Sequence, residues 1–152
     1  MTRVVVTGIG CVTAIGTGID ELWAGLRSRH SPIRTITRFD PEPFRSRIAA
    51  EVGDFHPADH LSRKTARRFD RFSQLGVAAA RMAVHDADFH PAVEDLDRCG
   101  VMMGSALGGV GLAEAQADIF MRDGIRSVDP GLALSVFGGA VSCNIAIEFG
   151  FT

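Results

Sequence analysis

The chain has 152 residues, of which 46% are hydrophobic and 22% are charged, a balance typical of a folded globular protein and not of a disordered one. Its formal net charge of −2 argues against a surface that binds nucleic acid in general. The sequence contains neither a signal-peptide pattern nor an apolar run long enough to cross a membrane, so it predicts a soluble cytoplasmic protein.

The first elements alternate between strand and helix. Residues 3–7 are rich in valine and end at Gly8, which predicts a short buried strand. Residues 18–26 carry apolar side chains at helical spacing and predict a helix, whereas the proline-containing stretch that follows predicts irregular structure. A short strand is expected at 48–52.

The second half repeats this alternation. A long helix is expected over 66–86, a second buried strand over 99–105, and a helix that ends at Gly124. Residues 138–149 are apolar nearly all round, which predicts a core helix with Gly150 just past its end. Alternating strands and helices indicate an α/β fold with a mostly parallel sheet covered by helices.

The glycines after the first strand raise the question of a dinucleotide site. Gly8 and Gly10 fit the first two positions of a Gly-x-Gly-x-x-Gly fingerprint, but Thr13 stands at the third. Helical periodicity begins only after Gly18, so no helix N-terminus would face a diphosphate. We therefore interpret these glycines as letting the backbone turn sharply between the strand and its neighbours, and we expect no nucleotide.

The sequence offers two candidate nucleophiles, and in both cases the surrounding residues do not fit the motif or the environment that such a role requires. Ser105 lies in MGSALGG, where Met103 occupies a position that a nucleophile elbow reserves for glycine. Cys143 lies within the predicted core helix with no nearby basic residue to lower its pKa, so it is expected to be an inert buried thiol. The three cysteines form no CxxC pair, and no histidine has metal-ligand spacing, so we expect no metal.

Four collinear stretches resemble one family. They are RVVVTGIGCVTAIG near the start, LSRKTARRFDRFSQLGVAAA at 61–80, GSALGGVG at 104–111 and FGGAVSCNIAIEFGFT at 137–152. Together they resemble the β-ketoacyl-acyl-carrier-protein synthases, the elongating condensing enzymes of fatty-acid and polyketide synthesis. The resemblance covers essentially the whole chain, in the expected order and spacing.

The resemblance implies a thiolase-like fold and a two-stage reaction. A cysteine thiolate accepts an acyl group from a carrier thioester. Two histidines then assist decarboxylation of a malonyl thioester, whose carbanion attacks the acyl-enzyme. No cofactor is implied. The partners implied are acyl carrier protein, acyl and malonyl thioesters, and a second copy in a homodimer, with no nucleic acid and no membrane.

The same resemblance implies that residues 1–152 are the N-terminal part of the synthase N-terminal domain, truncated before the nucleophile. In the family that cysteine follows the stretch that matches 137–152, and the catalytic histidines and lysine come later. We therefore assign no catalytic residue to this chain, and we expect the chain alone to be inactive.

Site residues are carried over only where motifs match. Leu107 matches a bulky apolar position that gates the acyl pocket, and Leu132 and Ala133 match a segment that lines the acyl pocket of the partner subunit. Gly131 and Leu134 depart from the family's aromatic and proline pattern there. The acyl-chain length and the pathway, fatty acid or polyketide, therefore stay open.

A basic stretch suggests where a carrier protein would dock. Residues 63–71 hold five basic side chains and one acidic one, a local charge of +4 in a chain whose net charge is −2. Such a patch would steer and orient an acidic carrier. Lys64, Arg67, Arg68 and Arg126 match the family's docking positions. From charge alone, a solvated basic face or internally paired arginines would explain the patch about as well.

A second reading is a complete, non-catalytic module that binds carrier protein or acts as a scaffold. It is motivated by a basic patch that occurs without a nucleophile. Against it, buried strands and an apolar helix would lack covering elements and would favour aggregation.

Overall fold

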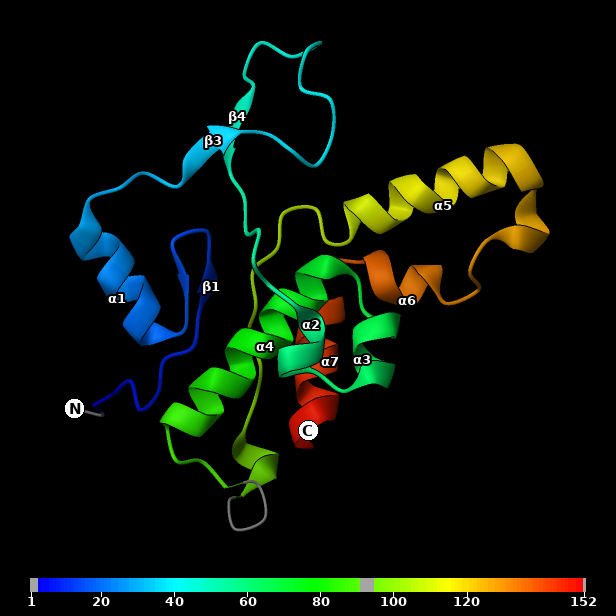
Figure 1. Cartoon of the computed structure of the whole chain (residues 1–152). Coiled ribbons are helices and arrows are strands. Elements are labelled where there is room, and N and C mark those ends of the chain that lie inside the picture. Colours follow the sequence, from blue (N-terminus) through cyan, green and yellow to red (C-terminus); the bar gives the residue numbers. More distant parts are fainter. Residues whose placement is uncertain (1–2, 91–94, 152) are drawn as a thin grey trace.

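The computed structural model describes residues 3–90 and 95–151 (Figure 1). A central helix, α4, carries the N-terminal segment on one side and α7 on the other. A hairpin and a helical arm project from this centre.

The helices, with their bounds, are α1 (Ile19–Ser28), α2 (Pro57–His60), α3 (Arg63–Arg68), α4 (Arg71–Asp86), α5 (Val110–Asp123), α6 (Leu132–Val136) and α7 (Ala140–Phe149). Short 3-10 turns lie at η1 (Leu96–Arg98) and η2 (Ile125–Ser127). The strands are β1 (Val12–Thr13), β2 (Gly16–Thr17), β3 (Ile33–Thr35) and β4 (Ile48–Ala50).

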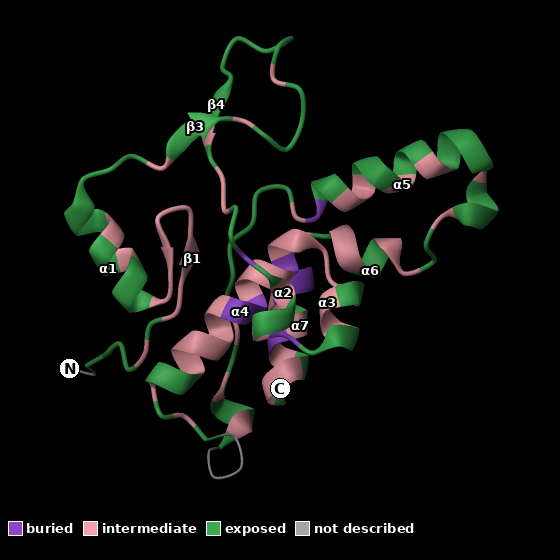
Figure 2. Cartoon of the chain, viewed as in Figure 1, coloured by how far each residue is buried: buried purple, intermediate pink, exposed green. Residues whose placement is uncertain are grey.

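The core lies where α4 meets α7. Figure 2 shows the buried residues gathered along these helices and under α2. Val77 on α4 packs with Val141 and Ile145 on α7 and with Leu61. Gly76 permits this approach, because a Cβ at its position would overlap the Val141 side chain. The buried core of the described chain is therefore formed mainly between two helices.

The long helix predicted over 66–86 is two helices instead. Ser62 caps α3, its hydroxyl accepting a hydrogen bond from the Thr65 amide at 3.1 Å. Asp70 caps α4, its carboxylate accepting from the Phe72 amide at 3.2 Å. Phe69 between them has extended dihedral angles and breaks the helix. Both caps are residue types that favour helix starts, and this signal outweighs the continuous apolar stripe.

The glycines after the first valines permit close packing against α4, which is a different reason from the sharp turn that the sequence predicts. A Cβ on Gly8 or Gly10 would overlap the backbone of α4, at Ala83 and Ala79 respectively. The segment is also held by the Ile9 amide, which donates to the Asp86 carboxylate at 2.8 Å. These contacts explain the glycines without a phosphate.

The predicted parallel sheet is not formed within the described residues. Their two sheets are short antiparallel hairpins, β1–β2 and β3–β4. Residues 3–7 and 99–105 are not strands, and the side chains of Val4 and Met102 are 94% and 97% exposed. A strand needs a neighbour to take its backbone hydrogen bonds, and neither segment has one here. The prediction of two buried strands is therefore wrong for this chain.

The other helices fall close to their predicted places. The helix expected at 18–26 is α1, and the helix expected to end at Gly124 is α5. α7 ends at Gly150, which has a positive φ of 73° as a glycine C-cap should. Only one side of α7 is buried, however, because Ile147 is 80% exposed and Cys143 is exposed. Among the described residues, no helix is long and apolar enough to span a membrane.

Candidate functional site

The most strongly charged surface of the chain is the outer face of α3. Arg63, Lys64, Arg67 and Arg68 are all exposed. None of these four side chains takes part in an ion pair or a hydrogen bond within residues 3–90 and 95–151. The alternative that these cations are neutralised by internal pairing therefore does not hold for the described part of the chain.

The inner face of α3 explains why the helix presents its cations outward. Ala66 and Phe69 are partly buried and pack against the core formed with Val77 and Val141. At helical spacing, an inner face fixed by these two side chains leaves positions 63, 64, 67 and 68 toward solvent. The structure thus brings Lys64, Arg67 and Arg68 together on one surface, as the sequence predicts.

Arg71 is the exception in the basic stretch. Its guanidinium points inward and donates to the carbonyls of Val52 at 2.8 Å and Phe55 at 3.2 Å. It also lies over the Phe55 ring, 5.2 Å from the centroid. Burial, with a smaller contribution from Arg38, lowers the pKa of this guanidinium. Arg71 is therefore a structural cation and does not belong to the exposed basic face of α3.

Sequence reasoning missed this role of Arg71, although a signal was present. A cation in the first turn of a helix faces the positive end of the helix dipole. Arg71 occupies the first residue of α4, directly after the capping Asp70. An arginine there has to be held by other partners, which here are the carbonyls before α2.

Arg126 lies apart from α3. It is exposed in η2, at the outer end of the arm that α5 forms in Figure 1. The described structure therefore does not merge Arg126 with Lys64, Arg67 and Arg68 into one patch. Any partner that contacts all four has to reach across from α3 to the arm.

The predicted acyl-pocket residues lie on two segments that touch. Leu107 is 73% exposed in the loop before α5, while Leu132 is half-buried and Ala133 is exposed at the start of α6. The Gly109 amide donates to the Val136 carbonyl at 2.9 Å, which ties this loop to the end of α6. The Ser105 hydroxyl accepts from the Gly108 amide at 3.0 Å, so it stabilises the turn of the loop.

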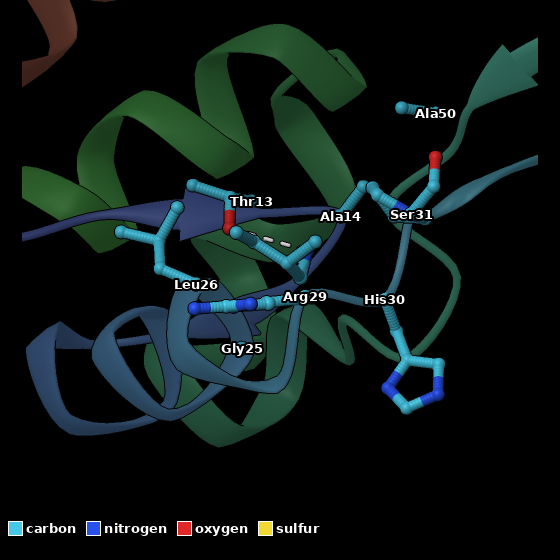
Figure 3. A pocket seen from close by; sticks show the side chains of 10 residues that line it. Thr13, Ala14, Gly25, Leu26, Arg29, His30, Ser31 and Ala50 are labelled. Atoms are coloured by element: carbon cyan, nitrogen blue, oxygen red, sulfur yellow. Dashed lines mark hydrogen bonds between the residues drawn. The ribbon is translucent and has the colours of Figure 1, made fainter.

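A hollow in the described part of the chain lies elsewhere. It measures about 480 Å³ between α1, the β1–β2 hairpin and β4 (Figure 3). Leu26 lines it from α1, Arg29 from the position just past the end of α1, and Thr13 from β1. The Thr13 hydroxyl accepts from the Ile15 amide at 3.3 Å. The His30 ring points away from Thr13 in Figure 3. None of the predicted site residues lines this hollow.

Cys143 is placed differently from the expectation. It is exposed on α7 and is not the buried core thiol that the sequence predicts. The pattern is apolar on every side of α7, whereas its buried residues are Ala140, Val141 and Ile145. No group of histidine, cysteine or carboxylate side chains in the described chain has the arrangement of a metal site.

Comparison with known proteins points to one family. The family described as "Beta-ketoacyl synthase, N-terminal domain" matches residues 1–152. The 3-oxoacyl-[acyl-carrier-protein] synthase 2 of Staphylococcus aureus (strain COL) is 35% identical over 148 residues, which are 97% of this chain and 36% of that protein. The protein of the same name from Coxiella burnetii (strain RSA 493 / Nine Mile phase I) is 36% identical over 150 residues, covering 96% of this chain and 36% of its own. The chain thus spans about a third of the length of these relatives.

Solved structures agree in fold. The ishigamide ketosynthase/chain length factor superposes with a TM-score of 0.82 at 35% identity, over 97% of this chain and 37% of that one. A β-ketoacyl synthase from Burkholderia phymatum STM815 gives 0.79 at 30% identity, over 99% and 38%. A type II polyketide ketosynthase in complex with its acyl-carrier protein gives 0.81 over 99% and 40%, but at 24% identity it supports the fold alone. These superpositions confirm the fold class predicted from the sequence.

Proposed function

Because this chain belongs to the β-ketoacyl synthase N-terminal domain family, which matches it over residues 1–152, we propose that the whole protein is a condensing enzyme of fatty-acid or polyketide biosynthesis. It joins an acyl thioester to a malonyl thioester held on a carrier protein. The new carbon–carbon bond forms at the acyl carbonyl, the acyl group leaves the enzyme thiolate, and carbon dioxide is released from the malonyl group. The single observation that carries this proposal is the family match along the full length of the chain.

The part that this chain plays is to receive the carrier and to shape the acyl site. No described residue is assigned to the bond-making chemistry. Lys64, Arg67 and Arg68 form the docking surface for an acidic carrier protein, and Arg126 on the arm makes a separate contact with it. Exposed, unpaired cations support this role, because a single-sign surface accelerates encounter and fixes orientation.

Leu107 lies at the acyl-chain gate, and Leu132 and Ala133 line an acyl pocket. The exposed side chain of Leu107 and its loop's hydrogen bond to the end of α6 are consistent with this assignment. We further propose that the whole protein is a cytoplasmic homodimer, which light scattering of the purified protein would test.

Charge reversal tests the docking surface. In the whole protein, Arg67→Glu and Arg68→Glu are expected to raise the KM for carrier-bound substrate by about tenfold, because opposite charges across the interface become like charges. The KM for a small free thioester should change little. The effect should shrink as ionic strength rises, since exposed charges are screened.

Arg27→Glu is the matched control, because Arg27 is an exposed arginine on α1, far along the chain from α3. It makes the same change in net charge and should leave both KM values near their starting level. Equal effects of Arg67→Glu on carrier-bound and free substrates would remove the docking role. Absence of any condensation by the whole protein would remove the proposed activity.

A further inference from the structure

Asp70 lies at the junction between the basic helix and the rest of the predicted site. α3 ends at Arg68, two residues before it, and α4 begins directly after it. Its carboxylate accepts from the Phe72 amide at 3.2 Å, and its carbonyl accepts from the Gln74 amide at 2.9 Å. A movement of the end of α3 would therefore displace Asp70.

Gln74 makes this junction stiff. Its side-chain amide donates to the carbonyls of Ala66 at 2.8 Å and Phe69 at 3.0 Å. Both carbonyls belong to the last turn of α3 and its cap, whereas Gln74 itself is on α4. The two helices are consequently fixed at a set angle, and Asp70 is the residue at their corner.

On its other side, Asp70 touches the loop that carries Leu107. Gly109 caps α5 and is buried. A Cβ at Gly109 would lie 3.2 Å from the Asp70 Cγ, 3.0 Å from the Ser135 carbonyl oxygen and 3.1 Å from the Val136 Cα. A methyl group at Gly109 would therefore be tight against both Asp70 and the end of α6, and the loop or its neighbours would have to shift by a few tenths of an ångström.

A carboxylate suits this position for an electrostatic reason. Asp70 stands at the N-terminus of α4 and against the first residues of α5. The first amides of a helix have no partner within the helix, and they lie at the positive end of its dipole. One negative charge therefore stabilises two helix starts and holds them together.

We propose that the contact between Asp70 and Gly109 positions the Leu107 loop against both the α3 docking surface and α6, so that Asp70 is a positioning residue for acyl-chain selection. This inference rests on the proposed function. Asp70 and Gly109 do not touch the reacting atoms. They fix the position of the Leu107 loop. Because Asp70 also lies at the end of α3, the same residue connects the position of this loop to the surface that receives the carrier.

A glycine pair tests the contact through specificity. In the whole protein, Gly109→Ala pushes the loop away from Asp70 and α6, so the ratio of kcat/KM for a long and a short acyl thioester should change by about five- to tenfold. Gly111→Ala is the matched control, because nothing lies within 4 Å of a Cβ there. Its ratio should stay within about twofold of the starting protein, since helix propensity alone does not move Leu107.

A second pair tests Asp70 without relying on activity. Hydrogen exchange in the whole protein should be faster in Asp70→Ala both in the first turn of α4 and at residues 105–109. Asp70→Asn keeps the capping oxygen but loses the charge, so it should restore the first turn of α4 and leave the loop partly loosened. The ratio of kcat/KM for long and short acyl thioesters should change in the variants whose loop exchanges faster, whether or not the first turn of α4 is protected.

The outcomes separate this inference from the proposed function. If condensation and carrier selectivity are normal but Gly109→Ala leaves the acyl-length ratio unchanged, the positioning role is wrong and the proposed function stands. Faster exchange in α4 alone after Asp70→Ala would also overturn it, because the loop would then be independent. If no acyl thioester is condensed at all, both the proposed function and the role in acyl selection fail.

Discussion

Glycines allow neighbouring segments to pack closely against the central helix, α4. Gly8 and Gly10 let the N-terminal segment lie against the backbone of α4, and Gly76 lets α7 do so from the other side. In each case a Cβ would overlap an atom that has little room to move. At Gly109 a Cβ would likewise be tight against its neighbours. The absence of a side chain at single glycines therefore determines how closely elements pack in both the core and the candidate site.

Gly76→Ala is expected to destabilise the whole protein. The added methyl overlaps the side chain of Val141, which is 2% exposed and packed in the core. Overpacking of this kind costs about 1–3 kcal/mol, and the gain of about 1 kcal/mol in helix propensity offsets only part of it. Thermal unfolding should therefore show a lower midpoint.

Gly111→Ala is the control for Gly76→Ala, since it makes the same change inside a helix where the methyl meets open space. It should keep or raise the midpoint. Equal midpoints for the two variants would mean that Val141 yields to the methyl and that the α4–α7 packing is looser than its geometry indicates.

Most helices were predictable from this sequence, whereas of the three predicted strands only the one at 48–52 is present, as β4 (Ile48–Ala50), and the difference has a physical reason. A helix satisfies its backbone hydrogen bonds internally, so the periodicity of α1, α5 and α7 was enough. A strand depends on a neighbour that the local sequence does not reveal, and residues 3–7 and 99–105 lack one in the described chain. The break between α3 and α4 was readable from Ser62 and Asp70, but the apolar stripe concealed it.

The β3–β4 hairpin contains a carboxylate whose ionisation should control its stability. Glu51 accepts from the Thr37 hydroxyl at 2.8 Å and from the amides of Thr37 and Arg38 at 3.1 Å and 3.3 Å. These bonds, above all the one from the Thr37 hydroxyl, hold the pKa of Glu51 below its usual value of 4.5. The ionised form is therefore the one that the folded hairpin prefers.

A depressed pKa fixes the direction of the pH effect. The stabilisation by Glu51 is present above its unfolded pKa and is lost as pH falls through its lower folded value. Exchange of the Thr37 and Arg38 amides, corrected for intrinsic rates, should show weaker protection below about pH 4. Glu51→Gln should remove this pH dependence, and Glu42→Gln, at the exposed pair with Arg47, should not. Protection that declines equally in all three proteins would show that Glu51 does not hold the hairpin.

For the molecule as a whole, charge patterning predicted the exposed basic face of α3 but not the different placement of Arg71. Lys64, Arg67 and Arg68 could be placed on one helix face because their spacing is local. Arg71 could not be separated from them, since the carbonyls that hold it come from the segment before α2. The proximity of Asp70 to Gly109 was not predictable from the sequence, because the two residues are distant along the chain and only the fold brings them together.

The exposed apolar surface predicts how residues 1–152 behave when produced alone. Val4, Val5 and Val6 are 94%, 73% and 79% exposed, and Ile147 on α7 is 80% exposed. Large apolar side chains exposed to this degree bind hydrophobic dyes and promote association. The excised segment should therefore bind such a dye strongly, self-associate and unfold over a broad temperature range, whereas the whole protein should bind little dye and unfold sharply.

One substitution tests whether the exposed face of α7 is covered by the rest of the whole protein. Ile147→Asp should be tolerated in the excised segment and should reduce its dye binding, because the side chain already faces solvent there. In the whole protein the same change should lower the unfolding midpoint, because an unpaired charge would be buried against the rest of the fold. Ser127→Asp, in the exposed η2 turn, serves as the control and should be tolerated in both. If the excised segment instead binds no dye and unfolds cooperatively, its interior is closed without further chain, and a self-contained carrier-binding module becomes the better account of this sequence.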